Sequence, residues 1–382
     1  MAIRLASAPR INFDGVAHVL EEAVGAGAVP GAVILVARGD EVVYHAAFGD
    51  RSLEPQRAPV DVDTVYDLSS LTKALATTTV LLHLVRERKL RFDDRLSRFL
   101  QNFGVYGKSP ITVRHLLAHC SGLAAWRPFA AAIASPTGLA ALASGGRRAA
   151  VYERIHRERL EYEPGTKTVY SDLGFILLGE LIELLTHSPL TRAFHDRVVR
   201  PLGLHETAFV DVSALRVRRL VTVNDRIAPT EYLPTLGRVL CGEVHDDNAR
   251  AMGGVAGHAG LFSTAADVHR IAARLRAAWR GEDDWLPQDV IREAWRRDGQ
   301  VPGSTWALGW DMPTPGASSA GHRASSTSVG HLGFTGTSIW IDLERDAHVV
   351  LLTNRVHPSR ENELIRELRP RVHDAVWEAL DA

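Results

Sequence analysis

The order of strand-like and helical segments along the chain constrains its fold most strongly. Residues 31–49 contain two apolar, β-rich runs joined by Gly39-Asp40, and this pattern predicts a tight antiparallel hairpin. Strand-like sequence returns only late, at residues 306–312, 337–342 and 348–354. The intervening sequence has mostly helical periodicity. Because strands lie at both ends of the chain and helices lie between them, we expect one sheet built from both termini.

We therefore predict an α+β protein with two subdomains. Hairpin connections at both ends favour an antiparallel sheet over a doubly wound parallel one. The sheet subdomain comprises residues 1–65 and 250–382, and two helices flank its sheet, one over residues 14–24 and one that starts at Pro370. Residues 66–249 form a second, mainly helical subdomain.

The charged residues are balanced in sign, which excludes some partners, and few of the basic ones are lysines. The 382 residues include 44 basic and 45 acidic side chains, with a formal net charge of -1. This balance predicts no nucleic-acid partner, because such partners need a basic surface. Only four of the 44 basic residues are lysines: Lys73, Lys89, Lys108 and Lys167. A lysine in a special position is therefore a candidate for a special role.

Three features predict a soluble, cytoplasmic protein. Residues 1–15 lack the apolar core of a signal peptide. The most apolar stretches are interrupted by His or Glu before the roughly 20 residues that a membrane span needs. The two cysteines, Cys120 and Cys241, are too few for a disulfide framework, so we expect free, buried thiols. The protein would be periplasmic if a leader has been removed.

The segment Ser70-Leu71-Thr72-Lys73 is the strongest candidate for chemistry, because it starts a helical pattern over residues 71–85. Residues three apart share one face of a helix, which places the Lys73 amine beside the Ser70 hydroxyl. A serine hydroxyl needs a base before it becomes a nucleophile, and a lysine can act as that base when its pKa is lowered. An exposed serine beside a solvated lysine would show the same spacing.

Two further segments carry polar residues next to turns. Tyr170-Ser171-Asp172 lies between a Pro-Gly turn and an apolar helix, and a phenol beside an ammonium can relay a proton. The same triplet also suits a simple helix N-cap. His331-Leu332-Gly333 lies on or just before a strand, where glycine lets a ligand approach the backbone.

In this order the three segments resemble the signature of the penicillin-recognising serine hydrolases. That family includes class C β-lactamases, D-Ala-D-Ala carboxypeptidases and family VIII-type esterases, and it carries S-x-x-K, then Y-x-N or Y-S-x, then K-T-G or H-x-G. The segments ITVRHLLAHCSGL, EPGTKTVYSDLGFILLG, GGVAGHAGLFSTAADV and GHLGFTGTSIWID also resemble the family's segments. The likeness runs from about residue 31 to residue 354 and implies a β-lactamase/transpeptidase-like fold with its active site between the subdomains.

The resemblance implies catalytic roles for three residues. Ser70 would be the acylated nucleophile, Lys73 the base or its partner, and Tyr170 the proton relay. Which of the lysine and the tyrosine is the acylation base stays open. The backbone N–H groups of Ser70 and Phe334 would form the oxyanion hole, with Gly333 beside them.

Three positions depart from the family pattern. Asp172 stands where Asn is usual, so its charge would hold Lys73 protonated and shift the base role toward Tyr170. His331 replaces the usual lysine and Leu332 the usual threonine, and both changes weaken anion recognition at that strand. These departures favour an uncharged ester over a penicillin.

We therefore predict a serine hydrolase that forms an acyl-enzyme with a small ester or amide and needs no cofactor. A carboxylesterase is the first choice, and a β-lactamase or D-Ala-D-Ala carboxypeptidase is the alternative. A non-catalytic ligand binder of the same fold is a third reading. His115 and His119 have the i, i+4 spacing of a helical zinc pair, but neither an H-E-x-x-H motif nor a third ligand accompanies them, so we predict no metal site.

Overall fold

The computed structural model describes residues 11–101, 103–133, 144–210 and 225–382. The expectation about a signal peptide falls mainly on residues 1–10, outside these ranges. Cys120 and Cys241 are both free thiols, but only Cys120 is buried, whereas Cys241 is half-buried. Among the described residues no single helix has the length and apolar composition to cross a membrane; Asp172–Thr186 and Leu190–Leu202 meet that test only jointly, and they are bent by 76°.

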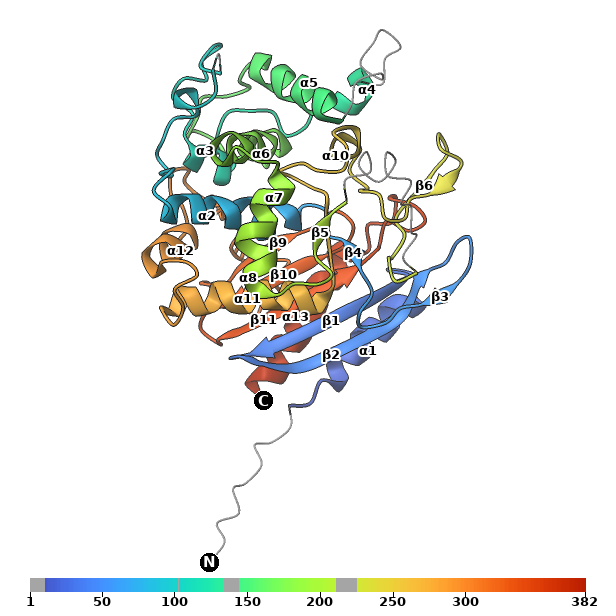
Figure 1. Ribbon diagram of the computed structural model, residues 1–382. Helices are drawn as coiled ribbons and strands as arrows, with labels where there is room; N and C mark the ends of the chain where they lie inside the picture. Colours follow the sequence, from blue (N-terminus) through green and yellow to red (C-terminus); the bar gives the residue numbers. More distant parts are fainter. Residues whose placement is uncertain (1–10, 102, 134–143, 211–224) are drawn as a thin grey trace, which may run out of the picture.

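A six-stranded antiparallel sheet joins the two ends of the chain, as predicted (Figure 1). Its strand order is β3-β2-β1-β11-β10-β9. The bounds of these strands are β1 Gly31–Arg38, β2 Glu41–Ser52, β3 Ala58–Pro59, β9 Val329–Leu332, β10 Ser338–Asp342 and β11 Ala347–Thr353. The N-terminal hairpin pairs with the C-terminal strands through β1 and β11, where Ile34 lies opposite Leu351. The predicted hairpin and the predicted late strands at β10 and β11 are therefore confirmed.

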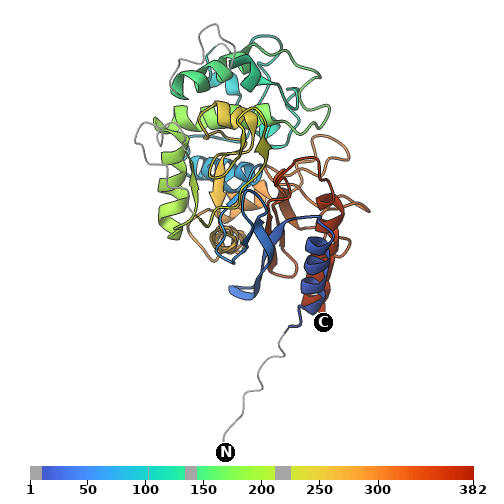
Figure 2. The ribbon, with the colours of Figure 1, turned by 90° about the vertical axis from the view of Figure 1, so that its right-hand side faces the viewer.

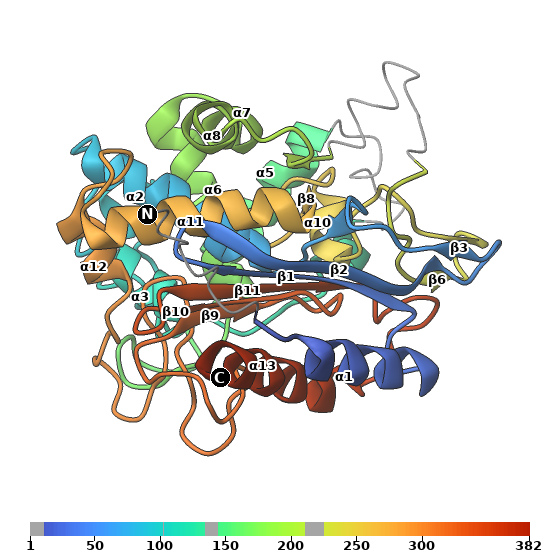
Figure 3. The same cartoon turned by 90° about the horizontal axis from the view of Figure 1, so that it is seen from below.

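Helices cover both faces of this sheet (Figure 3). Helix α1 (Asp14–Gly25) and helix α13 (Ile365–Asp381) lie side by side on one face, where the first and last parts of the chain meet (Figure 2). Helix α11 (Ala265–Arg280) packs on the opposite face. Side chains of β1 alternate between the two layers: Ile34 faces α1 and α13, whereas Leu35 joins the larger core. Strand periodicity of two residues produces this alternation.

The remaining elements form a mostly helical region on the other side of α11 (Figure 1). Its helices are η1 Lys73–Thr78, α2 Thr79–Arg86, η2 Leu96–Arg98, α3 Val113–Leu117, α4 Phe129–Ile133, α5 Ser144–Arg157, α6 Asp172–Thr186, α7 Leu190–Phe194, η3 His195–Val199, α8 Arg200–Leu202, α10 Asp247–Ala251 and α12 Gln288–Ala294. Its short strands are β4 Tyr66–Asp67, β5 Ala208–Phe209, β6 Tyr232–Leu233, β7 Arg238–Val239 and β8 Leu261–Ser263. The predicted subdomain boundaries at residues 65 and 249 remain a prediction.

Three expected elements differ from the structure. Residues 306–312 form no strand and contribute only an isolated bridge between Asp311 and Gly330, because Gly309 turns the chain with a φ of 76°. The last helix starts at Ile365 rather than Pro370, since burial of Ile365 and Leu368 under the sheet carries it upstream.

The helix predicted over residues 71–85 is the third difference, because its first part is a π-helix over Lys73–Thr78. The Thr79 hydroxyl donates to the carbonyl of Ala74, five residues earlier, which matches this wider turn. Such segments recur at functional sites. Here the π-helix starts at Lys73, three residues after the candidate nucleophile Ser70.

Candidate active site

Ser70 lies at the point where the chain leaves the short strand β4 and enters the buried helix η1. Its hydroxyl oxygen accepts a hydrogen bond of 2.9 Å from Lys73 Nζ, which is the contact that the i, i+3 spacing predicts. Ser70 is half-buried, whereas Lys73 is fully buried. A cavity of about 540 Å³ opens onto the serine, and Ser70, Tyr170, Asp172 and His331 all line it.

The Lys73 amine is surrounded by three acceptors. Besides Ser70 Oγ, these are Asp172 Oδ1 at 2.7 Å and the carbonyl of His258 at 3.1 Å. Burial alone would lower the pKa of Lys73, but the Asp172 carboxylate and the Tyr170 hydroxyl outweigh it and hold that pKa above its usual range. Three acceptors use all three protons of an ammonium group. The lysine is therefore a cation when no substrate is bound.

Tyr170 packs over this cation, with Lys73 Nζ 4.9 Å from the centre of its ring. Its hydroxyl interacts with both Lys73 and Ser70, and both interactions favour the ionised phenol. Burial raises the pKa of Tyr170 above its usual value, although the Lys73 charge opposes this. The phenol therefore keeps its proton at neutral pH, so it cannot act as a phenolate base before substrate binds.

The local sequence of the second segment fixes both polar side chains. Ser171 caps helix α6, since its hydroxyl accepts from the backbone N–H of Gly174, and Asp172 is the first residue of that helix. The N-cap reading of this triplet is thus correct for Ser171. Asp172 turns toward Lys73, so one segment supplies the cap, the phenol and the counter-ion.

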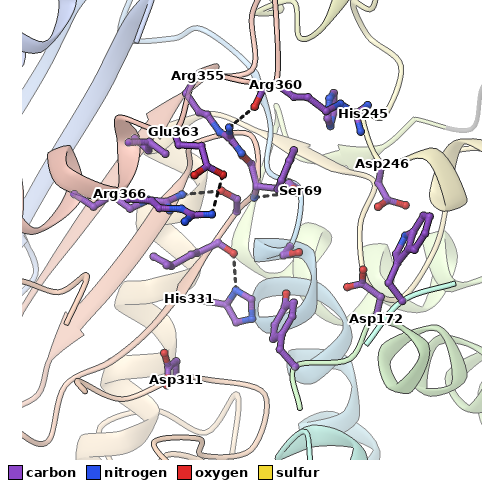
Figure 4. A pocket seen from close by; sticks show the side chains of 18 of the residues that line it. Ser69, Asp172, His245, Asp246, Asp311, His331, Arg355, Arg360, Glu363 and Arg366 are labelled. Atoms are coloured by element: carbon purple, nitrogen blue, oxygen red, sulfur yellow. Dashed lines mark hydrogen bonds and ion pairs between the residues drawn. The ribbon is translucent and has the colours of Figure 1, made fainter. Parts of the chain in front are cut away.

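His331 and Gly333 lie at the edge of the sheet, on and just after strand β9, where Figure 4 shows His331 on the opposite side of the cavity from Asp172. Gly333 packs so closely on the preceding segment that a Cβ there would lie 2.6 Å from the carbonyl oxygen of Leu68. The loop must therefore have glycine at this position to approach the nucleophile. Phe334 follows and is half exposed, with its ring in the cavity.

His331 is a neutral imidazole in a fixed tautomer. Its Nδ1 lies 2.9 Å from the carbonyl oxygen of Leu332, so Nδ1 carries the proton and Nε2 carries the lone pair. Among the described residues, no group is hydrogen bonded to Nε2. Burial and the Lys73 charge lower the pKa of His331 to about 3. The position where the family usually has a lysine therefore has no positive charge here.

One supporting residue of Tyr170 was not recognised from the sequence. His119 accepts a hydrogen bond at Nδ1 from the backbone N–H of Ser171, and its own carbonyl accepts from Val169. Its ring lies 4.6 Å from the Tyr170 ring and 4.3 Å from that of Trp306. His119 thus holds the segment that carries the phenol. The sequence offered only its i, i+4 spacing from His115, which does not indicate a contact with the Tyr170 segment.

Charged residues of the cavity wall were also missed. These residues come from the turn after β11 and the start of α13: Arg355, Arg360, Glu363, Arg366 and Arg369. Figure 4 labels the first four of them. Arg360 pairs with Glu231 at 2.6 Å and Arg366 with Glu363 at 2.8 Å. Arg355 and Arg369 are buried and donate to backbone carbonyls rather than to carboxylates. No local motif marks these residues, because only the fold brings them to the serine.

No metal site is assigned. His115 caps helix α3 together with Thr112, and His119 contacts the Tyr170 segment, so each has a structural partner. Within the described ranges, the one group with the spacing of metal ligands is Asp172, Asp246 and His258, whose ligand atoms lie within 4.8 Å of one another. Lys73 is bound to Asp172, and His258 Nε2 lies 2.8 Å from Asp246. These contacts account for the cluster without an ion.

A serine, a lysine one turn later and a tyrosine beside both define the class of serine hydrolases that act without a histidine–aspartate triad. The chain belongs to the β-lactamase family, whose model matches residues 16–372.

Two curated relatives are each 31% identical to the chain over the aligned region. A putative D-alanyl-D-alanine carboxypeptidase of Escherichia coli K12 is 31% identical over 352 residues, which cover 86% of this chain and 79% of that protein. An N-acetylmuramyl-L-alanine amidase of Bacillus subtilis 168 is also 31% identical, over 89% of this chain and 80% of its own.

Among solved structures, the hydrolase EstCE1 superposes on this chain with a TM-score of 0.68 at 24% identity. The superposition covers 94% of this chain and 98% of the EstCE1 chain. This likeness confirms the predicted β-lactamase/transpeptidase-like fold.

Proposed function

We propose that the protein hydrolyses small, uncharged carboxylic esters through an acyl-enzyme on Ser70. The observation that carries this proposal is the neutral His331 at the strand edge, whose Nδ1–H donates a hydrogen bond to the carbonyl of Leu332. A lysine there would hold a substrate carboxylate, whereas an unprotonated imidazole presents a lone pair that repels one. An ester without a charged group meets no such penalty.

Tyr170 relays the proton in this proposal. Its hydroxyl contacts Ser70 and Lys73, so it can take the Ser70 proton while it passes its own to the leaving alcohol. The Ser70 oxygen forms the new bond to the acyl carbon, and the bond to the alcohol oxygen breaks. Water then attacks the acyl carbon and passes one proton through Tyr170 to Ser70 Oγ. The bond between Ser70 Oγ and the acyl carbon breaks, which releases the acid and restores the serine hydroxyl. Lys73 stays an ammonium and stabilises the negative charge near Ser70 Oγ.

The direct test combines turnover with intact mass. We expect hydrolysis of p-nitrophenyl butyrate by the wild-type protein, a transient butyryl adduct of the intact chain, and loss of both in Ser70→Ala. Full turnover by Ser70→Ala would show that the proposed mechanism is wrong. A persistent adduct without turnover would instead support the non-catalytic binder.

The arginine-rich wall favours a second candidate, an amide substrate that bears a carboxylate. Arg355 and Arg369 are buried, and within the described ranges neither is hydrogen bonded to a carboxylate. The named activities of the two relatives, a carboxypeptidase and an amidase, are amide hydrolyses. Burying a guanidinium without a counter-ion is costly, and a bound anion would offset that cost. Faster turnover of nitrocefin or of a D-Ala-D-Ala peptide than of the butyrate ester would reverse our order of preference.

A further inference from the structure

Ser69, the residue before the candidate nucleophile, occupies an unexpected position in the site. Its hydroxyl oxygen accepts the backbone N–H of Phe334 at 3.2 Å. The family resemblance implies that this same N–H is one of the two donors of the oxyanion hole. A side-chain oxygen of the protein therefore lies where the oxygen of a substrate carbonyl is expected to bind.

The backbone of Ser69 is held rigidly in an unfavourable conformation. Its φ is 50°, in the left-handed region that few residues other than glycine adopt. Its N–H donates to Asp67 Oδ1 at 2.8 Å, and its carbonyl accepts from the Thr72 hydroxyl at 2.6 Å and from the Thr72 N–H at 3.0 Å. These bonds fix the direction of the Ser69 Cβ atom. Strain that is held by surrounding contacts often marks a functional site.

The loop after strand β9 is attached to this segment by two further hydroxyl groups. Thr335 Oγ1 donates to the carbonyl of Asp67 at 2.7 Å, and Thr337 Oγ1 donates to that of Leu68 at 3.0 Å. Neither threonine lines the cavity, whereas Ser69 does. The two threonines therefore join the loop to this segment independently of Ser69.

The Ser69 hydroxyl still has a proton to give. Within the described part of the chain, its only hydrogen bond is the one that it accepts from Phe334. A hydroxyl that accepts from an amide becomes a better donor, because hydrogen bonds in a chain polarise one another. Its proton is thus free to point into the cavity beside Ser70.

We propose that Ser69 is a catalytic residue whose hydroxyl donates to the oxyanion, as a third donor beside the N–H groups of Ser70 and Phe334. This inference rests on the proposed acyl-enzyme function. In the free protein the hydroxyl accepts the Phe334 N–H. When the carbonyl oxygen of the substrate enters, it takes over that N–H, and the hydroxyl rotates about χ1 to donate to the same oxygen.

No bond to Ser69 forms or breaks in this step. Ser70 Oγ bonds to the carbonyl carbon, the carbonyl π electrons move onto the oxygen, and the Ser70 proton leaves through Tyr170. Ser69 keeps its proton and stabilises the new negative charge through a hydrogen bond. Removing one side-chain donor from an oxyanion hole lowers kcat by about 10²- to 10³-fold in a known case.

The test uses Ser69→Ala and Ser69→Gly in the full-length protein with p-nitrophenyl butyrate. Both variants lack the hydroxyl, but only glycine relieves the left-handed strain. We expect both to lose about tenfold to a hundredfold in kcat with little change in KM, because the hydroxyl acts in the transition state. Unchanged or faster turnover in Ser69→Ala would overturn the proposal, because the hydroxyl would then occupy the oxyanion hole without stabilising the oxyanion. A loss in alanine that glycine restores would also overturn it, since backbone strain would be the cause.

Binding of an alkyl boronic acid gives a readout that a purely structural role would not move. Its tetrahedral adduct on Ser70 places an oxygen in the oxyanion hole, so both Ser69 variants should bind it more weakly by about the factor lost in kcat. Thr335→Val is the matched control, because it removes a hydroxyl that joins the same loop to the same segment outside the cavity. If Thr335→Val and Ser69→Ala lose equal factors in boronic acid affinity and kcat, Ser69 only attaches the loop, and the proposal is overturned.

Failure of this inference and failure of the proposed function are distinguishable. If the wild-type protein forms no adduct on Ser70 with esters, the proposed function fails. If it forms the adduct and both Ser69 variants turn over like the wild type, only the role of Ser69 fails.

Discussion

The two sides of the cavity differ in how their charges are balanced. On the helical side, formed by Lys73, Tyr170 and Asp172, neighbouring groups balance the charge of the lysine. The Lys73 ammonium contacts the Asp172 carboxylate, the Tyr170 phenol and the Ser70 hydroxyl. The strand side, formed by His331, Phe334 and the arginines near α13, has a neutral imidazole at the edge and buried guanidinium groups behind it. Under the proposed function, the helical side supplies the chemistry of the site and the strand side distinguishes substrates. Substitutions on the two sides should therefore have different kinetic signatures.

The largest effect is expected from Lys73→Arg on the helical side. A planar guanidinium cannot reproduce the three contacts of the buried amine in the same space. We expect a loss of about 10³-fold or more in kcat, in the range seen when catalytic groups that act as a unit are removed. Ester turnover measures it. Lys89→Arg is the control, because Lys89 is half exposed and pairs with Glu87, so it should keep wild-type turnover.

Asp172→Asn removes the carboxylate that keeps Lys73 protonated, and it restores the residue usual in the family. The Asp172 charge raises the pKa of Lys73, so its loss should lower that pKa and let the amine lose its proton at a lower pH. We expect the pH profile of kcat/KM to change on its alkaline side and move to lower pH. An unchanged profile would mean that Lys73 does not change its protonation in the rate-limiting step.

His331→Lys tests the strand side by introducing the cation that the family usually has. We expect nitrocefin, which bears a carboxylate, to gain about tenfold in kcat/KM, equivalent to about 1.4 kcal/mol, while the neutral ester gains nothing. Parallel assays of the two substrates measure the ratio. A gain for both substrates, or for neither, would show that this position does not discriminate charge.

Arg366→Ala should have the smallest effect. The Arg366 side chain is largely exposed and pairs with the exposed Glu363, and such pairs contribute about 0–1 kcal/mol. We expect ester kinetics to stay unchanged and KM for a carboxylate-bearing substrate to rise by only a few fold. The matched variant Glu363→Gln removes the negative partner instead, so it should lower the KM for the carboxylate-bearing substrate. A large loss of ester turnover in Arg366→Ala would contradict a division of roles between the two sides.

Much of the helical side could be predicted because its parts are close in sequence. Ser70 and Lys73 meet through a single helical turn, and Ser171 caps the helix that begins at Asp172. The π-helix at Lys73–Thr78 could not be predicted, because its Thr77 hydroxyl bonds the carbonyl of Gly257, far along the chain. Trp306 was expected on a strand and lies instead in a loop, where its ring packs against His119, which is far away in the sequence.

The sequence by itself determined the antiparallel hairpin, the sheet built from both termini and the pairing of Ser70 with Lys73, since each depends on periodicity or on neighbours within a turn. The resemblance also implied that Asp172 would keep Lys73 protonated, but only the tertiary structure decided the contacts around Lys73 and the charge state of His331. Lys73 is an ammonium because Asp172 and the His258 carbonyl surround it, and His331 is neutral because it is buried near that ammonium. The arginines behind the strand and the Ser69 hydroxyl in the expected oxyanion position also come from folding. Electrostatic interactions depend on distance and burial in space, and sequence separation does not encode them.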